Sequence, residues 1–243
     1  MPTNFEILPS NQPIADEIRD NILKNPGFGK HFTDHMAHVR WTVDADWHGH
    51  QVRPYGPLTL DPAASVLHYG QEIFEGIKAY RHADGSIWTF RPEKNAERFR
   101  RSARRLALPE LSDEDFIGSL KALLAQDQAW VPTPANASDE CSLYLRPFMI
   151  ASEAFLGVRP AHEVDYYVIA SPRRRTLKAA LPRYRSGSRL TTSVRPPAAP
   201  ALPSVAATTP LHWPRRKRPK PISVVRSRSW MPLKTSGWKS WAA

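Results

Sequence analysis

The pattern of apolar and polar positions predicts extended structure in the first part of the chain. Apolar and polar residues alternate over His38–Val43, as in a half-buried strand, and the turn-rich stretch Gly49–Leu60 leads into a second extended piece. Ile77–His82 and Ile87–Phe90 flank Ala83-Asp84-Gly85-Ser86. Because an Asp-Gly pair between two such runs is a strong signal for a tight turn, the sequence predicts a β-hairpin here.

Helical spacing follows the hairpin. Pro92 is typical of the first turn of a helix, and apolar residues then recur at the interval of one helical face. This stripe consists of Ala96, Phe99, Ala103 and Leu106. A second helix is predicted to run from Ser112, a good N-cap residue with Asp115 as an acidic partner, to about Trp130.

Two nearly continuous apolar segments, Ser142–Ala151 and Val164–Ser171, have the composition of strands that are buried on both faces. A hairpin, two helices and buried strands together predict an α/β or α+β domain. A core strand needs hydrogen-bonded neighbours, because its backbone groups are removed from water. Since this domain ends on such a strand, we expect it to require neighbouring strands that the chain does not supply.

The composition changes abruptly at Pro172. The chain has 34 Lys and Arg, 23 Asp and Glu, and a formal charge of +11. Residues 1–172, the body, hold 17 of the basic residues and all 23 acidic ones, for a formal charge of −6. Residues 173–243, the tail, hold the other 17 basic residues and no Asp, Glu, Asn or Gln. Two unrelated kinds of sequence are joined at this point.

The body has the length and composition of a domain with its own core. It contains no apolar run of about 18 residues, which argues against a membrane span, and Met1–Asp20 lacks the apolar segment of a signal peptide. The single cysteine, Cys141, excludes an intramolecular disulfide and is expected to be a small buried residue of a cytoplasmic protein. Five histidines lie close together in the sequence, but none has a Cys or acidic partner at ligand spacing, so no metal site is predicted. They are His31, His35, His38, His48 and His50.

The tail is rich in Pro, Arg and Ser, with ten prolines. Such a segment cannot bury enough apolar area to offset the entropy of ordering it, so disorder is expected. As a functional segment it would be a nucleic-acid-binding arm of low specificity, in which the basic cluster Arg215–Lys220 binds phosphates and tryptophans stack on bases. The tryptophans are Trp213, Trp230, Trp238 and Trp241. A solvated basic tail without a partner is the plain alternative.

A third interpretation of the tail is a shifted reading frame. When the third base of each codon is joined to the first two bases of the next, Ser229–Ala243 can be read as Val-Asp-Ala-Val-Glu-Asp-Lys-Trp-Val-Glu-Glu-Leu-Gly-Gly. Val194–Leu211 can be read as Pro-Pro-Ala-Gly-Gly-Thr-Gly-Ala-Ala-Lys-Cys-Gly-Gly-Asn-Tyr-Ala-Ala. Acidic residues, glycines and periodicity return together, which a random basic tail would not do. We therefore expect a frameshift near Pro172–Thr176.

Five stretches of the body follow one another in the order and spacing of a known family. They are Phe28–Met36, Leu67–Tyr80, Phe90–Arg98, Arg101–Pro109 and Ser142–Pro147. With them, the region from about Asn25 to Pro172 resembles the branched-chain amino-acid aminotransferases, fold type IV enzymes that use pyridoxal 5′-phosphate. The segment Gly-Gly-Thr-Gly-Ala-Ala-Lys-Cys-Gly-Gly-Asn-Tyr of the alternative frame is similar to the cofactor-lysine segment of the same family. The resemblance implies that residues 1–172 form the N-terminal domain of that fold.

The resemblance also implies roles for individual residues. Arg98 takes the place of the family's phosphate-binding arginine, and a guanidinium fork matches phosphate oxygens. The apolar side chain of the substrate would lie among aromatic residues, which are Phe28, Tyr69, Phe74 and Tyr144. Arg146 would recognise the second carboxylate of glutamate. The implied reaction is reversible transfer of the amino group of leucine, isoleucine or valine to 2-oxoglutarate, usually in a homodimer.

The lysine that forms an imine with the cofactor has no counterpart in the frame as written, because its codon in the alternative frame spans Pro203 and Ser204. Lys78 lies in a body motif, but nothing indicates that it replaces this group. The chain as written is therefore expected to be inactive and poorly folded. The alternatives are another fold type IV enzyme, such as a D-amino-acid aminotransferase or an aminodeoxychorismate lyase, and a basic-tailed nucleic-acid-binding protein.

Overall fold

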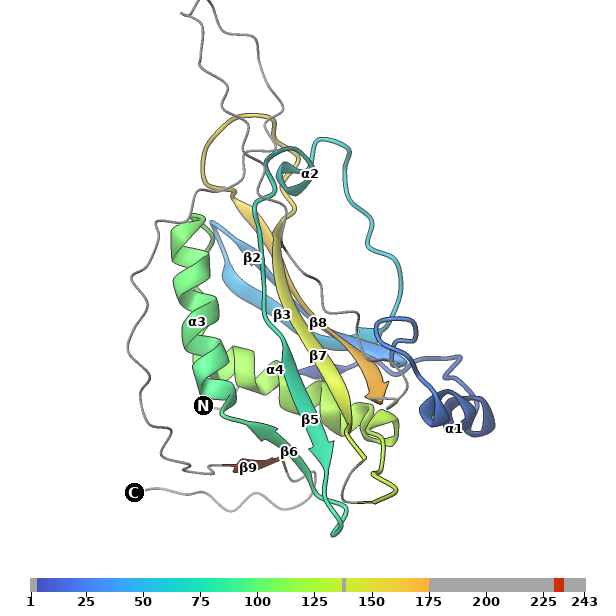
Figure 1. Ribbon diagram of the computed structural model, residues 1–243. Helices are drawn as coiled ribbons and strands as arrows, with labels where there is room; N and C mark the ends of the chain where they lie inside the picture. Colours follow the sequence, from blue (N-terminus) through green and yellow to red (C-terminus); the bar gives the residue numbers. More distant parts are fainter. Residues whose placement is uncertain (1–3, 137–138, 175–229, 234–243) are drawn as a thin grey trace, which may run out of the picture. The chain divides into compact units, whose positions relative to one another are not determined.

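A mixed sheet with two long helices on one face forms most of the described part of the protein (Figure 1). The computed structural model describes residues 4–136, 139–174 and 230–233, the last of these by backbone alone, and all of them belong to one compact unit. The helices are α1 (Asp16–Lys24), α2 (Ser65–Tyr69), α3 (Pro92–Arg105) and α4 (Asp113–Gln126). The strands are β1 (Glu6–Ile7), β2 (His35–Thr42), β3 (Asp46–Pro54), β4 (Glu72–Phe74), β5 (Ile77–Arg81), β6 (Ile87–Phe90), β7 (Cys141–Ala151), β8 (Glu163–Arg174) and β9 (Trp230–Leu233).

The strand order is β1-β3-β2-β8-β7-β5-β6-β9, and β4 pairs with β7 beside β5. Among these described strands, β1 and β3 run parallel and the other pairs are antiparallel. Both β4 and β5 therefore pair with β7, and the two residues that connect them, Glu75 and Gly76, lie beside the middle of β7. This connection brings the family motifs of the sequence together.

The core lies between the sheet and the two long helices, which cover the same face (Figure 1). Phe99 of α3 and Phe116 of α4 pack against each other and against Tyr166 of β8, with ring centroids 5.4 to 6.3 Å apart. The hydroxyl of Tyr166 is hydrogen-bonded to Ser119, which satisfies the polar atom of this fully buried ring. The body thus has a continuous core of its own, as its length and composition led us to expect.

The hairpin and both helices are confirmed. β5 and β6 pair antiparallel around the Asp-Gly turn, α3 begins at Pro92, and the Ser112 hydroxyl accepts a 2.9 Å hydrogen bond from the Asp115 backbone N–H at the start of α4. α4 ends at Gln126, and a short 3₁₀ turn continues the chain to Trp130. Leu106 was wrongly assigned to the buried stripe, because it follows the last turn of α3 and is 39% exposed.

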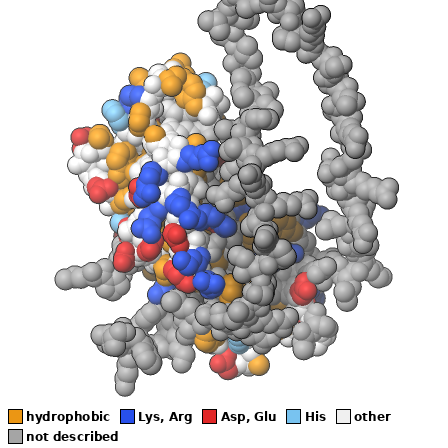
Figure 2. Space-filling model, turned by 60° about the vertical axis from the view of Figure 1, so that its left-hand side comes forward, with side chains coloured by type: hydrophobic (Ala, Val, Ile, Leu, Met, Phe, Trp, Pro, Cys, Tyr) orange, Lys and Arg blue, Asp and Glu red, His pale blue; other side chains and the backbone are white. Residues whose placement is uncertain are grey.

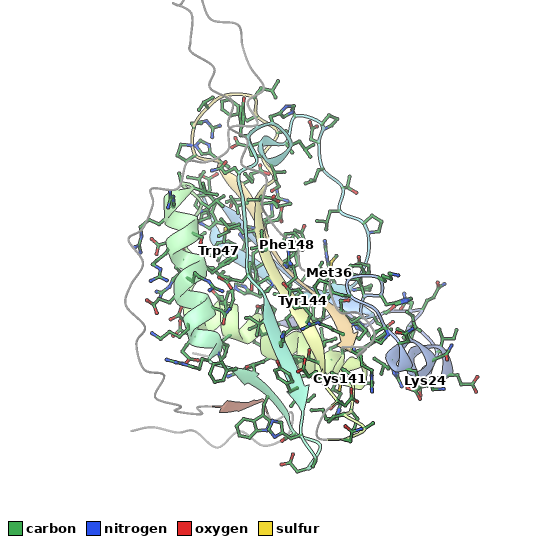
Figure 3. The ribbon with its side chains drawn as sticks, in the orientation of Figure 1. Lys24, Met36, Trp47, Cys141, Tyr144 and Phe148 are labelled. Atoms are coloured by element: carbon green, nitrogen blue, oxygen red, sulfur yellow. The ribbon has the colours of Figure 1, made fainter. Side chains whose placement is uncertain are left out.

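β8 has neighbours on both sides, so the expectation that the chain does not supply them is wrong. β2 pairs with one edge of β8 and β7 with the other, each over many residues. β8 is largely buried on both faces, as predicted. In β7 the burial alternates, because Leu143 and Leu145 point into the core while Tyr144, Arg146 and Phe148 are only half-buried on the opposite face (Figure 3).

The structure describes little of the tail. β8 continues through the break at Pro172 to Arg174, and β9 pairs antiparallel with β6. A strand at Trp230–Leu233 differs from the disorder expected for the whole tail. The basic cluster Arg215–Lys220 and the segment Val194–Leu211, with its alternative frame, lie outside the described residues.

Candidate active site

Three consecutive residues, Phe74-Glu75-Gly76, connect most of the side chains that the sequence nominates. They lie where the chain passes from β4 to β5, beside β7. The Glu75 backbone N–H donates a 2.8 Å hydrogen bond to the Pro147 carbonyl, which fixes this connection to β7. Each of these three residues contacts a different side chain that the sequence nominated.

Glu75 contacts Arg98, the predicted phosphate ligand on α3. Arg98 Nε and Nη2 each donate a 2.5 Å hydrogen bond to one oxygen of the Glu75 carboxylate. The Asn95 side-chain amide donates a further 2.8 Å hydrogen bond to Glu75 Oε2. The Glu75 side chain is 4% exposed and that of Arg98 is 60% exposed, so a buried carboxylate holds an exposed guanidinium group.

The Glu75 carboxylate is ionised at neutral pH. Burial raises the pKa of this carboxyl, but the hydrogen bonds from Arg98 and Asn95 and the positive charge of Arg98 lower it by more. The net result is a pKa below the ordinary value. The hydrogen bond and charge of Glu75 in turn raise the pKa of Arg98.

Phe74 contacts Arg146. The guanidinium carbon of Arg146 lies 4.5 Å from the centroid of the Phe74 ring and 5.3 Å from that of Tyr144. Arg146 Nη2 and Nε also donate hydrogen bonds of 2.8 and 3.2 Å to the Tyr144 hydroxyl oxygen. A charge within an apolar strand needs a partner, and the structure supplies a phenol oxygen and two aromatic faces.

Gly76 contacts Tyr144. A Cβ atom at this position would overlap the Tyr144 hydroxyl oxygen and would lie 3.1 Å from Cζ of the same ring. Gly76 does not have a positive φ, so close approach, and not backbone conformation, requires glycine here.

Phe28 joins this group and Tyr69 does not. Phe28 meets Tyr144 edge-on, with ring centroids 5.2 Å apart. Tyr69, at the end of α2, donates its hydroxyl hydrogen bond to the Leu156 carbonyl, and its described contacts include none of the other nominated residues. Phe28 and Phe74 are exposed, at 57% and 62%, so this group forms an open surface and not an enclosed pocket; Tyr69 is 46% exposed.

The surface of α3 outside Arg98 carries exposed ion pairs. Figure 2 shows Lys and Arg side chains grouped on this face with acidic side chains between them. Arg101 pairs with Glu97 and Arg104 with Glu110, in both cases between exposed side chains. Arg98 differs from these arginines because its carboxylate partner is buried.

Three of the five histidines form separate pairs with carboxylates. His35 Nδ1 and His38 Nε2 lie 2.6 Å from oxygens of Asp127 and Asp165, and His50 Nε2 lies 3.1 Å from Asp115. In the described part of the chain, no three His, Cys, Asp or Glu side chains form a group that could hold a metal ion. Nor does any described helix have the length and apolar character needed to cross a membrane. Cys141 is buried at the start of β7 (Figure 3), and burial raises the pKa of its thiol.

A cavity of about 480 Å³ lies on the open face near β2, β3 and β8. Its lining includes His38, Arg53, Asp165 and Tyr167 and none of the nominated residues. We place the candidate site at Arg98, Glu75 and Tyr144 because the convergent polar contacts lie there.

Glu75, Asn95 and Gly76 were not singled out from the sequence. Glu75 carried a usable signal, because an acid between apolar strand residues needs a cationic partner when it is buried. Asn95 and Arg98 are three residues apart, which places them on one face of α3. No pattern in the sequence indicated that Gly76 lies against Tyr144.

No protein-family model matches the chain. Among curated proteins, the branched-chain-amino-acid aminotransferase of Mycolicibacterium smegmatis is 60% identical over 171 residues, which are 70% of this chain and 46% of that protein. A probable branched-chain-amino-acid aminotransferase of Streptomyces coelicolor is 60% identical over 168 residues, 69% of this chain and 46% of that protein. The Mycobacterium tuberculosis enzyme is 55% identical over 168 residues, with 69% and 45% covered. The chain therefore spans about half the length of the curated relatives that it matches.

Solved structures of similar shape include the branched-chain amino acid aminotransferase of Escherichia coli, with a TM-score of 0.42 and 21% identity over 56% of this chain and 41% of that one. The enzyme of Thermobaculum terrenum in its PLP form has a TM-score of 0.38 and 16% identity over 55% and 39%. These values are too low to add to what the sequence relatives establish.

Proposed function

Since the matched part of this chain belongs to the branched-chain-amino-acid aminotransferase family, we propose that the body supplies part of a site for pyridoxal 5′-phosphate and an amino-acid substrate. One observation carries the proposal. Arg98 from α3 and Tyr144 and Arg146 from β7, each nominated from the sequence for a different part of the ligand, meet at the three residues Phe74-Glu75-Gly76.

Arg98 fits the role of a phosphate ligand. Glu75 occupies Nε and Nη2 of its guanidinium, so Nη1 lies on the edge that faces away from the carboxylate and can donate to an anion. The negative charge of Glu75 compensates the charge of Arg98. Arg98 by itself therefore supplies only part of a phosphate site. The cofactor, when bound, supplies the electron-withdrawing ring that makes the α-proton of an amino acid acidic.

Arg146 and the aromatic residues fit an amino-acid substrate. Phe28, Phe74 and Tyr144 present apolar ring area to a branched side chain, which gains free energy by leaving water. Arg146 is held between Phe74 and Tyr144 without a carboxylate partner among the described residues. A carboxylate of glutamate or 2-oxoglutarate is the partner that we assign to it.

The group that moves the proton is missing from the chain as written. The cofactor lysine appears only in the alternative frame, across Pro203 and Ser204, so neither the covalent cofactor bond nor a base at that position can form. We therefore propose that the gene, in its correct frame, encodes a cytoplasmic, homodimeric transaminase of leucine, isoleucine or valine. Because of the frameshift, the chain as written lacks this activity.

The test compares the chain as written with the product of a gene whose frame is corrected near Pro172. The chain as written should not transfer the amino group of L-leucine to 2-oxoglutarate, and the corrected product should. Transfer from D-alanine in place of L-leucine by the corrected product would favour a D-amino-acid aminotransferase. Transfer from L-leucine by the chain as written would contradict the assignment of the missing lysine.

A further inference from the structure

We propose that Glu75 is the positioning residue for Arg98, holding its guanidinium so that Nη1 is directed toward an anionic phosphate. The inference rests on the proposed function, because it concerns the same phosphate site. Phosphate binding by Arg98 and its positioning by Glu75 do not require the missing lysine, so both can be tested on the chain as written.

The geometry leaves one edge of Arg98 for a ligand. A guanidinium is planar and has donors in fixed directions. Two hydrogen bonds of 2.5 Å fix Nε and Nη2 on the two oxygens of Glu75. Among the described residues no hydrogen bond is recorded for Nη1. Because the two bonds fix the plane of the group, they also fix the direction in which Nη1 donates.

Glu75 is itself fixed to the sheet. Its backbone N–H donates to the Pro147 carbonyl of β7, and its Oε2 accepts from the Asn95 side chain at 2.8 Å and from the Gly76 backbone N–H at 3.4 Å. The side chain is 4% exposed, so water does not compete for these bonds. The orientation of Arg98 is therefore set by the connection between β4 and β5, and not by α3 alone.

A second arginine of α3 provides a matched control. Arg104 Nε and Nη2 donate to Glu110 at 2.8 and 2.7 Å, the same fork as in Arg98–Glu75. There the acid is exposed, at 39% compared with 4% for Glu75. Glu110→Gln removes the carboxylate partner of another α3 arginine without disturbing a buried network.

The positioning role and a purely electrostatic role predict opposite effects. Glu75 is ionised, so Glu75→Gln removes one negative charge from the surroundings of Arg98. If charge alone mattered, this substitution would strengthen the binding of a phosphate. If orientation matters, binding weakens, because Arg98 must be ordered by the ligand itself.

The experiment uses the full chain with ¹⁵N-labelled arginine and pyridoxamine 5′-phosphate as the probe. For the wild type we expect a resolved Arg98 Nε–H signal that exchanges slowly with water, together with weak binding of the probe. Glu75→Gln should abolish the slow exchange and weaken binding about tenfold, the effect of losing one charge-assisted hydrogen bond. Asn95→Ala, which leaves the acid in place, should have a smaller effect in the same direction, and Glu110→Gln should change neither readout.

Two results would overturn the inference in different ways. Slow exchange of the Arg98 signal in Glu75→Gln, or tighter binding of the probe by that variant, would show that Glu75 does not position Arg98. Probe binding that is absent in the wild type, or unchanged in Arg98→Met, would instead remove the phosphate role of Arg98, and with it the proposed function. Should Glu75→Gln not fold by circular dichroism, Asn95→Ala decides: unchanged exchange and unchanged affinity in that variant would overturn the positioning role.

Discussion

Replacement of Gly76 by alanine tests the contact that brings β7 against the connection between β4 and β5. The added Cβ would overlap the Tyr144 hydroxyl oxygen and would lie 3.1 and 3.2 Å from Cζ and Cε2 of the same ring. Because the backbone at Gly76 does not have a positive φ, alanine meets no conformational penalty there. The effect of the substitution is therefore steric.

The expected cost follows from what Tyr144 must give up. To make room, the ring must move away from Gly76, and its hydroxyl then loses the 2.8 and 3.2 Å hydrogen bonds from Arg146. Overpacking at a well-packed contact costs about 1–3 kcal/mol, and we expect about 2 kcal/mol of lost unfolding free energy. With an m-value of about 2 kcal/mol/M, the urea midpoint falls by about 1 M without a change in m.

The assay is urea unfolding of four proteins, namely wild type, Gly76→Ala, Tyr144→Phe and the double variant. Tyr144→Phe removes the oxygen that a Cβ would overlap, so Gly76→Ala should cost less than about 1 kcal/mol in that background. The reasoning is refuted if Gly76→Ala leaves the midpoint unchanged, or lowers it equally in both backgrounds.

Three further predictions concern other parts of the body. Ser112→Ala removes the 2.9 Å cap on the Asp115 backbone N–H and should destabilise the protein by about 0.5–2 kcal/mol in thermal or urea unfolding; a smaller change than in Ser112→Gly would contradict the cap. Burial raises the pKa of the Asp165 carboxyl, but interactions with His38, Ser152 and Arg40 together lower it by more, so the folded pKa lies below the ordinary value of 3.8. The stability from this carboxylate is present above pH 3.8 and is lost as the pH falls through the folded pKa, so Asp165→Asn should show a shallower loss of unfolding free energy below pH 3.8 than the wild type, and parallel curves would refute this. Cys141 is buried and its thiol pKa is raised, so iodoacetamide at pH 8 should label it slowly in the native chain and rapidly in urea, and equal rates would contradict its burial.

Local patterns predicted much of the fold. The Asp-Gly turn, Pro92 and the Ser112 cap specify structure through a few neighbouring residues, and each is found where the sequence placed it. Leu106 was assigned wrongly because periodicity does not show where a helix ends. The position of β8 between β2 and β7 was not predictable, since strand pairing depends on residues far apart in the chain.

The sequence nominated residues of the candidate site but not the residues that contact them. Arg98, Tyr144 and Arg146 were nominated through the family resemblance, and the structure brings them to one place. Glu75 and Gly76 act through contacts with α3 and β7 that only the folded chain creates. Tyr69 was nominated in the same way, but its hydroxyl is hydrogen-bonded to the Leu156 carbonyl, away from that group.

The central claim, that the tail is an aminotransferase segment read in the wrong frame, is tested most directly by the codons of Pro203 and Ser204. An alternative-frame Lys-Cys at this point requires CCA for Pro203 and AGT for Ser204, because the third base of one codon must join the first two bases of the next. We predict that DNA sequencing will find these codons, with an inserted or missing base between the codons for Tyr167 and Leu177. A Ser204 codon that begins with TC, or a Pro203 codon that does not end in A, would contradict the account, because no lysine would then exist in that frame.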